Sequence, residues 1–219
     1  MHREIITTKD GSSSIFVPEL NETYHSIHGA KNEAIHVFIQ MGYHKLIELH
    51  QPLHILEIGL GTGLNACLTL AEAQKNNHSI YYTAIEKYPV NINELKLLNY
   101  SEFLSSEDLH WIHESAWNNP VQHPNNNFIL QKLQIDIVDI PLSEKYHLIF
   151  FDAFAPNKQP KMWTKEILGN MYKILLPNGL LTTYCCRGEV KRTLQEVGFK
   201  VEKVPGPPGK REMINAWKV

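Results

Sequence analysis

The sequence predicts an α/β fold in which helices cover both faces of a mainly parallel sheet. Three observations indicate it. Apolar strand-like segments alternate with helical segments from residue 51 onward, and a glycine-rich turn joins the first of these strands to a helix. The last two strands are joined by PGPPGKRE, which is too short for a crossover helix, so we expect them to pair antiparallel at one edge of the sheet.

Residues 1–50 are predicted to form an extension that packs on this sheet. A β-branched run, the turn Lys9-Asp10-Gly11 and a second run up to Pro18 predict a hairpin over residues 3–18. Helical spacing of apolar residues predicts a helix over residues 30–49. Residues 51–219 then make up a Rossmann-like domain.

The elements of this domain follow from hydrophobic periodicity and from turn residues. Strands are expected at residues 53–59, 79–86, 128–135, 146–152, 180–186, 199–204 and 213–219. Helices are expected at residues 64–75, near 90–98, and at 107–117, 163–175 and 189–197. A sheet of this kind with a hairpin edge is the arrangement of class I S-adenosylmethionine-dependent methyltransferases, an analogy of fold that leaves function open.

Composition excludes several classes of protein. The 219 residues are 43% hydrophobic and carry a formal net charge of −2, which excludes a broadly basic nucleic-acid coat. No apolar run is long enough to span a membrane, and the N-terminus lacks the apolar core of a secretory signal. Three cysteines and twelve scattered histidines indicate neither a disulfide framework nor a metal site. We therefore expect a cytoplasmic protein without a metal.

The turn EIGLGTG places Gly59, Gly61 and Gly63 between a strand and a helix. Glycines let the backbone approach a ligand closely, and the following helix offers free N–H groups. The dinucleotide fingerprint has its third glycine one residue later, at the position that Leu64 occupies here. Glu57 precedes the turn and suits a cationic ligand group. A plain glycine turn between strand and helix is the alternative.

Three further acidic residues end predicted strands. Glu86 follows the second strand, where Rossmann-like folds bind a ribose diol, and Asp136 follows the third. Asp152 follows a strand apolar enough to be central, where an unpaired carboxylate is costly. The alternatives are ordinary solvated charges for Glu86 and a helix cap for Asp152. Since ligands bind at the carboxyl edge of such sheets, we expect a site there.

Three segments together resemble a known family. EIGLGTGLN, DAFAPNKQPKMWT and PPGKREM are similar to the methyltransferase domain of the tRNA 5-methylaminomethyl-2-thiouridine biosynthesis protein, the MnmC-like methyltransferase family, and ETYHSIHGAKNEAIHVFI resembles that family's N-terminal segment. The resemblance implies methyl transfer from S-adenosylmethionine to the exocyclic amine of 5-aminomethyl-2-thiouridine in the tRNA anticodon loop. The sequence departs from the fused form of that family, since no second glycine fingerprint that could hold FAD is present, and we therefore expect a stand-alone form without FAD.

The resemblance also implies roles for individual residues. Asp152 would be catalytic and face the acceptor amine. The cofactor would be bound by Glu57, Gly59, Gly61, Gly63, Asn65, Glu86, Lys87, Asp136 and Ile137. The tRNA would be contacted by Phe154, Lys158, Trp163, Lys210 and Arg211, although either aromatic side chain could pack in the core, and a tryptophan at a helix start, such as Trp163, is more typical of packing. A small-molecule amine methyltransferase, an aminopropyltransferase and a non-catalytic nucleotide-binding module are the alternative functions.

Overall fold

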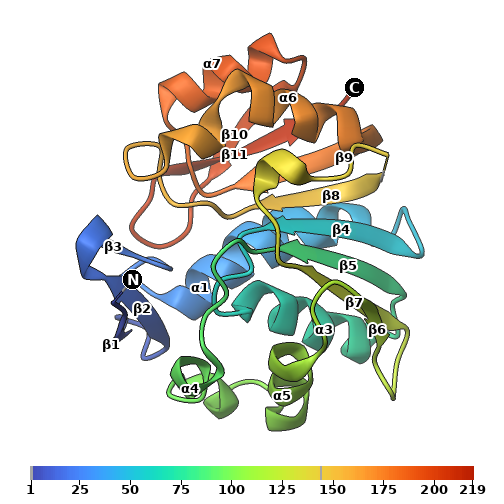
Figure 1. The fold of residues 1–219 in the computed structure, drawn as a ribbon. Helices are drawn as coiled ribbons and strands as arrows, with labels where there is room; N and C mark the ends of the chain where they lie inside the picture. The colour runs from blue at the N-terminus through green and yellow to red at the C-terminus, as the bar shows by residue number, and fades with distance from the viewer. Residues whose placement is uncertain (1, 144) are drawn as a thin grey trace.

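The computed structural model describes residues 2–143 and 145–219, and its centre is an eight-stranded sheet with helices on both faces (Figure 1). The strand order is β10-β11-β9-β8-β4-β5-β7-β6. Five neighbouring strands in the middle of the sheet run parallel: β4 (Leu53–Ile58), β5 (Ile80–Ile85), β7 (Phe128–Leu133), β8 (Tyr146–Phe151) and β9 (Leu175–Thr183). The predicted mainly parallel sheet is confirmed.

Antiparallel strands close both edges of the sheet. At one edge β10 (Lys200–Pro205) pairs with β11 (Glu212–Trp217), as the short linker predicts, and β11 pairs with β9. At the other edge the short strand β6 (Pro120–Gln122) pairs with β7 and was not predicted. Within the described residues, no helix is long and apolar enough to cross a membrane.

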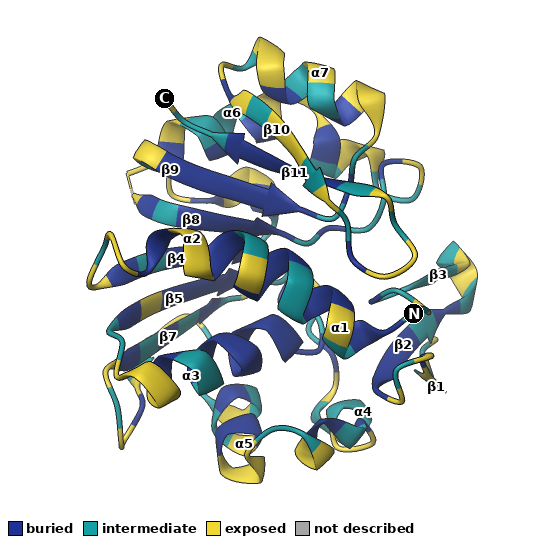
Figure 2. Cartoon of the chain, turned by 180° about the vertical axis from the view of Figure 1, so that it is seen from behind, coloured by how far each residue is buried: buried dark blue, intermediate teal, exposed yellow. Residues whose placement is uncertain are grey.

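Two hydrophobic clusters lie on opposite faces of the sheet. One face packs against a continuous helix, made of α1 (Ala30–Ala34), the π-helical η2 (Ile35–Tyr43) and α2 (His44–Leu46), and against α3 (Leu64–Asn76) and α5 (Ser106–Glu114). The other face packs against α6 (Lys165–Ile174) and α7 (Gly188–Glu196). In Figure 2, buried residues on α1, α2 and α3 form stripes toward the sheet and exposed residues lie on the outer surface.

The alternation of side chains along the strands decides what reaches the functional edge. In β4, Ile55 belongs to the cluster on the α3 face and Leu56 to the opposite one. In β8, Phe150 lies on the α3 face and Phe151 on the other. A period of two therefore directs Glu57, and Asp152 just beyond its strand, toward the face that α3 covers.

The N-terminal extension is a small three-stranded sheet of β1 (Glu4–Thr7), β2 (Ser13–Val17) and β3 (Glu22–Thr23), with the turn η1 (Pro18–Leu20) before β3. The predicted hairpin is confirmed, and β3 is an addition. The turn between β1 and β2 caps α1. The side-chain oxygens of Thr8, Ser12 and Asp10 accept hydrogen bonds from the backbone N–H groups of residues 30, 31 and 32, at 3.1, 3.1 and 2.9 Å. These bonds satisfy donors that a helix start leaves free.

Several element boundaries differ from the prediction by a few residues, with the largest differences at the helix near 90–98 and at the strand predicted from residue 180. The helix near 90–98 is shorter: α4 covers Ile92–Leu95, and the 3₁₀ turn η3 (Asn99–Glu102) follows, because Asn99 accepts a 2.7 Å hydrogen bond from the backbone of Ser13. β9 begins at Leu175, not at residue 180. The sequence Pro177-Asn178-Gly179 lies inside β9, where the register against β8 shifts and Asn178 adopts a φ of 61°.

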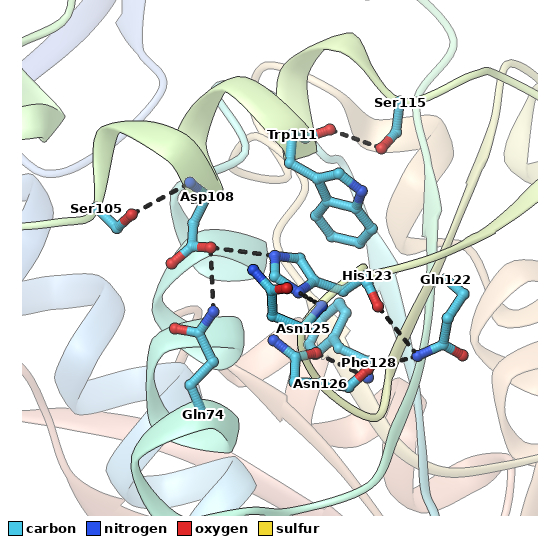
Figure 3. A network of polar contacts seen from close by, with 10 residues as sticks. All are labelled: Gln74, Ser105, Asp108, Trp111, Ser115, Gln122, His123, Asn125, Asn126 and Phe128. Atoms are coloured by element: carbon cyan, nitrogen blue, oxygen red, sulfur yellow. Dashed lines mark hydrogen bonds and ion pairs between the residues drawn. The ribbon is translucent and has the colours of Figure 1, made fainter.

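A buried polar network joins the β6–β7 loop to α3 and α5 (Figure 3). His123 Nδ1 accepts a 3.2 Å hydrogen bond from the Asn125 N–H group, so its own ring proton is on Nε2 and is donated to Asp108 at 3.1 Å. Asp108 also accepts from Gln74 Nε2 at 3.0 Å. His123 is 3% exposed. Through Asp108 on α5 and Gln74 on α3, its hydrogen bonds connect the edge of the sheet to both helices.

His123→Ala should lower the free energy of unfolding by about 1–3 kcal/mol, because Asp108 is left with a buried lone pair that no partner satisfies. Urea denaturation at pH 7 measures the loss. His110→Ala is the matched control, since the His110–Glu114 pair on the same helix is largely exposed and should contribute less than about 1 kcal/mol. Equal losses in the two variants would show that the network does not anchor this edge.

Candidate active site

A cavity of about 470 Å³ opens at the carboxyl ends of the central strands. Its wall is built from the glycine turn after β4, the segments that follow β5 and β7, the loop that follows β8, and the N-terminal sheet. Nine predicted residues line it: Gly59, Gly61, Glu86, Lys87, Asp136, Ile137, Asp152, Phe154 and Lys158. The sequence-based expectation of one site at this edge therefore corresponds to one cavity.

The glycine turn needs glycine for conformation and for space. Gly59, Gly61 and Gly63 have φ values of 89°, 53° and 78°, in the left-handed region. A Cβ on Gly59 would lie 2.8 Å from the carbonyl oxygen of Asp152, and one on Gly61 would lie 3.0 Å from the Tyr24 ring. Gly63 does not line the main cavity and instead borders a smaller hollow of about 150 Å³.

The carboxylates after β5 and β7 are held in the cavity wall. Glu86 accepts hydrogen bonds from the backbone N–H groups of Gly61 and Tyr88, at 3.1 and 2.8 Å. Asp136 starts the 3₁₀ turn η4 (Ile137–Asp139) and accepts a 2.6 Å hydrogen bond from Lys87 Nζ, which holds the pKa of Asp136 below its ordinary value. The protein's own hydrogen bonds therefore fix the orientation of both carboxylates, Glu86 and Asp136.

A single amide lies between the carboxylates of β4 and β8. Asn65 Nδ2, at the start of α3, donates to Glu57 Oε1 and to Asp152 Oδ2, each at 2.9 Å. Glu57 is fully buried and Asn65 is 3% exposed, and neither lines the cavity. Glu57, predicted to face a cationic ligand group, is thus one residue behind the surface that a ligand would touch.

Burial of these two carboxylates sets their protonation. Desolvation raises the pKa of Glu57 well above its ordinary value, and the nearby Asp152 carboxylate adds to the effect. Desolvation, together with the charge of Glu33, raises the pKa of Asp152 to about 7, against the opposing hydrogen bond from Asn65 and the charge of Lys210. Asp152 can therefore both accept and release a proton near neutral pH.

The loop after β8 closes one side of the cavity. The Phe154 ring meets Tyr24 edge-on at 5.2 Å between centroids, and Lys158 Nζ donates to the Leu20 carbonyl at 2.8 Å. Trp163, predicted as a substrate contact, lies instead in the core: it is 7% exposed and packs against Phe151 at 4.9 Å. Its indole N–H group donates to the Phe154 carbonyl at 2.8 Å, so Trp163 supports the loop from below.

The two other predicted substrate residues lie outside the cavity lining. Lys210, in the β10–β11 loop, forms a 2.8 Å ion pair with Glu33 and lies 3.9 Å from the centroid of the Tyr184 ring. Arg211 is exposed beside it. Any contact of Lys210 with a substrate would therefore compete with an existing ion pair.

Among the lining residues that sequence reasoning missed, Tyr24 and His25 come from the end of the N-terminal sheet. His25 is 9% exposed, and desolvation lowers its pKa to about 4, so the ring is neutral. No local pattern marks these residues as part of a site, because a separate sheet carries them to the cavity. Their one signal is that both lie in ETYHSIHGAKNEAIHVFI, the N-terminal segment of the family resemblance.

The lining fits an adenosine that carries a cationic chain. Ile85, Ile135, Ile137 and Val138 offer apolar contact to a base, and Glu86 and Asp136 offer acceptors to its hydroxyl and amino groups. Side chains at positions 59 and 61 would clash with the Asp152 carbonyl and the Tyr24 ring, and both of these residues line the cavity. The fold and the site together define a Rossmann-like nucleoside-binding enzyme.

A family model described as S-adenosyl-L-methionine-dependent methyltransferase matches residues 100–219, just over half of the chain. The chain belongs to this family, whose members use S-adenosylmethionine. The match begins after the glycine turn, so the family assignment does not depend on that short motif.

Curated relatives extend the similarity to most of the chain. The tRNA 5-methylaminomethyl-2-thiouridine biosynthesis bifunctional protein MnmC of Leptospira borgpetersenii is 30% identical over 210 residues, which are 89% of this chain and 32% of that protein. The protein of the same name from Leptospira interrogans is 32% identical over 214 residues, with 90% and 32% coverage. The chain thus spans about a third of the length of these relatives.

Solved structures share the fold. MNMC2 from Aquifex aeolicus superposes with a TM-score of 0.83 at 24% identity, over 98% of this chain and 69% of that one. Spermidine synthase from Thermotoga maritima superposes with a TM-score of 0.56 at 12% identity, over 100% of this chain and 72% of that one. At these identities the likeness concerns the fold.

Gly59→Ala should weaken S-adenosylmethionine binding at least about tenfold, because the new Cβ meets the Asp152 backbone and displaces one wall of the cavity. Isothermal titration calorimetry measures the affinity. Gly11→Ala is the matched control: Gly11 has a similar φ of 84° but nothing lies within 4 Å of its Cβ position, so the affinity should stay within about twofold. Equal affinities in both variants would contradict the proposed position of the ligand.

Asp152→Asn should stabilise the fold at pH 8 and not at pH 4. Because the folded-state pKa of Asp152 is raised to about 7, the folded protein binds more protons than the unfolded chain between about pH 4 and 7, and stability falls as pH rises through that window. The gain at pH 8 is at most about 4 kcal/mol, since one pKa unit corresponds to about 1.4 kcal/mol. Urea unfolding at both pH values measures it, and a pH-independent difference would contradict the shift.

Proposed function

We propose that this chain transfers a methyl group from S-adenosylmethionine to the exocyclic amine of 5-aminomethyl-2-thiouridine at the tRNA wobble position, which gives 5-methylaminomethyl-2-thiouridine. Two observations support the choice of substrate: the family of the chain and the names of its curated relatives. The proposal concerns the methyl-transfer step alone, because those relatives are described as bifunctional and the chain spans about a third of them. We place the reaction in the cytoplasm.

The position of Asp152 is the observation that carries the proposal. Asp152 lines the cavity, and its backbone carbonyl lies so near the first glycine of the turn that a Cβ on Gly59 would be 2.8 Å away. The acceptor is an alkylamine, which is mostly protonated at neutral pH and must lose a proton to become a nucleophile. A carboxylate in this position can both orient such an amine and receive its proton.

Asp152 has one oxygen free for this task. Asn65 donates to Oδ2, so Oδ1 is the atom that would accept a hydrogen bond from the amine. The raised pKa makes Asp152 a better proton acceptor than an exposed aspartate. With a pKa near the working pH, a large fraction of Asp152 carries the charge needed to accept a proton, and the proton is then bound more strongly than by an ordinary aspartate. S-adenosylmethionine, when bound, supplies an electrophilic methyl group. Alignment of amine and methyl group contributes up to about 7–11 kcal/mol in favourable cases.

Aromatic and basic side chains support recognition of a nucleotide. Phe154 and Tyr24 form an aromatic corner of the cavity, against which a flipped-out pyrimidine can stack. Lys158 and Lys161 line the cavity, and Arg211 is exposed in the β10–β11 loop. We expect these cations to contact anticodon-loop phosphates, despite the overall charge of −2.

The proposal is tested by incubating the protein with labelled S-adenosylmethionine and tRNA that carries 5-aminomethyl-2-thiouridine, followed by mass analysis of the nucleosides. We expect one added methyl group on the wobble nucleoside. Asp152→Asn should lower the rate at least about 100-fold, with S-adenosylmethionine affinity within about threefold of the original.

Asp139→Asn is the matched control, because Asp139 is an exposed acid at the end of η4 and does not line the cavity. Its rate should be unchanged. Absence of a methylated wobble nucleoside with the original protein would overturn the substrate. A normal rate with Asp152→Asn would leave the substrate standing and overturn the role of Asp152.

A further inference from the structure

Three side chains from three distant parts of the sequence meet behind Asp152. Glu33 lies on α1, Lys210 in the β10–β11 loop, and Tyr184 directly after β9. Lys210 Nζ is 2.8 Å from Glu33 Oε1 and 3.9 Å from the centroid of the Tyr184 ring. Glu33 Oε2 accepts a 2.7 Å hydrogen bond from the Ser26 N–H group, so both of its oxygens are engaged.

The ion pair is part of a larger contact between the β10–β11 loop and the N-terminal segment. The ring of His36, in the helix that continues α1, lies within hydrogen-bond distance of the Pro205 carbonyl, at 2.8 Å. Gly209 has a φ of 87°, and a Cβ there would overlap the ring of His28. Figures 1 and 2 both show the loop reaching from the sheet edge toward α1. The loop is therefore seated on the N-terminal segment, with Lys210 directly after the turn at Pro208 and Gly209.

This contact reaches Asp152 by two routes. The Tyr184 hydroxyl group donates to the Ala153 carbonyl at 2.9 Å, which ties Lys210 to the backbone beside Asp152. The charges of Glu33 and Lys210 also act directly on Asp152, in opposite directions. The side chains of Glu33 and Lys210 are 9% and 31% exposed, so water screens their charges only in part.

We propose that Glu33 and Lys210 are positioning residues for methyl transfer: their ion pair fixes the β10–β11 loop and holds one negative and one positive charge behind Asp152, which together set its capacity to accept a proton. Neither residue lines the cavity, so both act through Asp152. The inference rests on the proposed function, since it assumes that Asp152 serves an acceptor amine.

The other titratable groups near Asp152 contribute less charge. Desolvation raises the pKa of Glu57, Tyr82 and Tyr184 and lowers that of His25, which favours the neutral form of all four groups. Lys158 and Lys161 line the cavity, but the charges that act on the pKa of Asp152 are those of Glu33 and Lys210. Glu33 and Lys210 are therefore the paired charges through which Asp152 is tuned.

The test is the pH dependence of methyl transfer in Glu33→Gln, Lys210→Met and the double variant. Lys210→Met removes the positive charge and should move the midpoint of the acidic limb of the pH–rate profile up by at least about half a pH unit. Glu33→Gln removes the negative charge and should move that midpoint down by a similar amount. The double variant removes both charges and should return the midpoint close to the original. Lys203→Met is the control. Lys203 Nζ forms a 2.6 Å ion pair with Glu212 on the same hairpin, but both side chains are exposed to a larger extent than those of Glu33 and Lys210.

A purely structural role predicts another result. The single variants would then lose rate with unchanged midpoints, or their midpoints would move in the same direction, and either outcome would overturn the inference. NMR titration of the Asp152 carboxyl carbon in each variant, without tRNA, gives a second readout. If the original protein fails to methylate tRNA, the proposed function fails, and opposite shifts of the Asp152 titration still support the charge coupling, whereas their absence rejects it.

Discussion

The site depends on one constraint: a fully buried carboxylate, Glu57, and a half-buried one, Asp152, at the ends of neighbouring parallel strands, share a single amide. β4 and β8 pair in register and end at the same edge, with Glu57 and Asp152 directed to the same face of the sheet. Asn65, at the start of the helix that covers this face, donates to both. Desolvation is the largest cause that raises the pKa of Asp152 to about 7, and the Asp152 carboxylate in turn adds to the raised pKa of Glu57.

The rest of the molecule is arranged around this group. The glycine turn allows the Asp152 backbone to approach β4, and the N-terminal sheet supplies Tyr24 and His25 to the cavity wall. The C-terminal hairpin contributes Lys210 from behind, through Glu33. Segments from both ends of the sequence thus complete a site whose centre is formed by the middle strands. A Rossmann-like sheet provides the edge, and these additions give it its chemistry.

Most of the fold could be predicted because it follows from local patterns. Hydrophobic periodicity placed the parallel strands and most helices, and the short linker before Glu212 predicted the antiparallel edge. The misses have tertiary causes: Asn99 bonds to Ser13 and ends a helix early, and Leu175 pairs with Tyr146 and lengthens β9. Within the site, strand-end acids were predictable from topology, whereas the burial of Trp163 and the Lys210–Glu33 pair depend on contacts between distant segments, which periodicity does not encode.

A crystal structure of the protein with S-adenosylhomocysteine tests the central claim most directly. We predict that the ribose hydroxyl groups contact Glu86, that the chain of the ligand passes Gly59 and Gly61, and that its sulfur atom faces the Asp152 carboxyl group across a space large enough for an amine. A ligand bound elsewhere, or one whose sulfur points away from Asp152, would contradict the account.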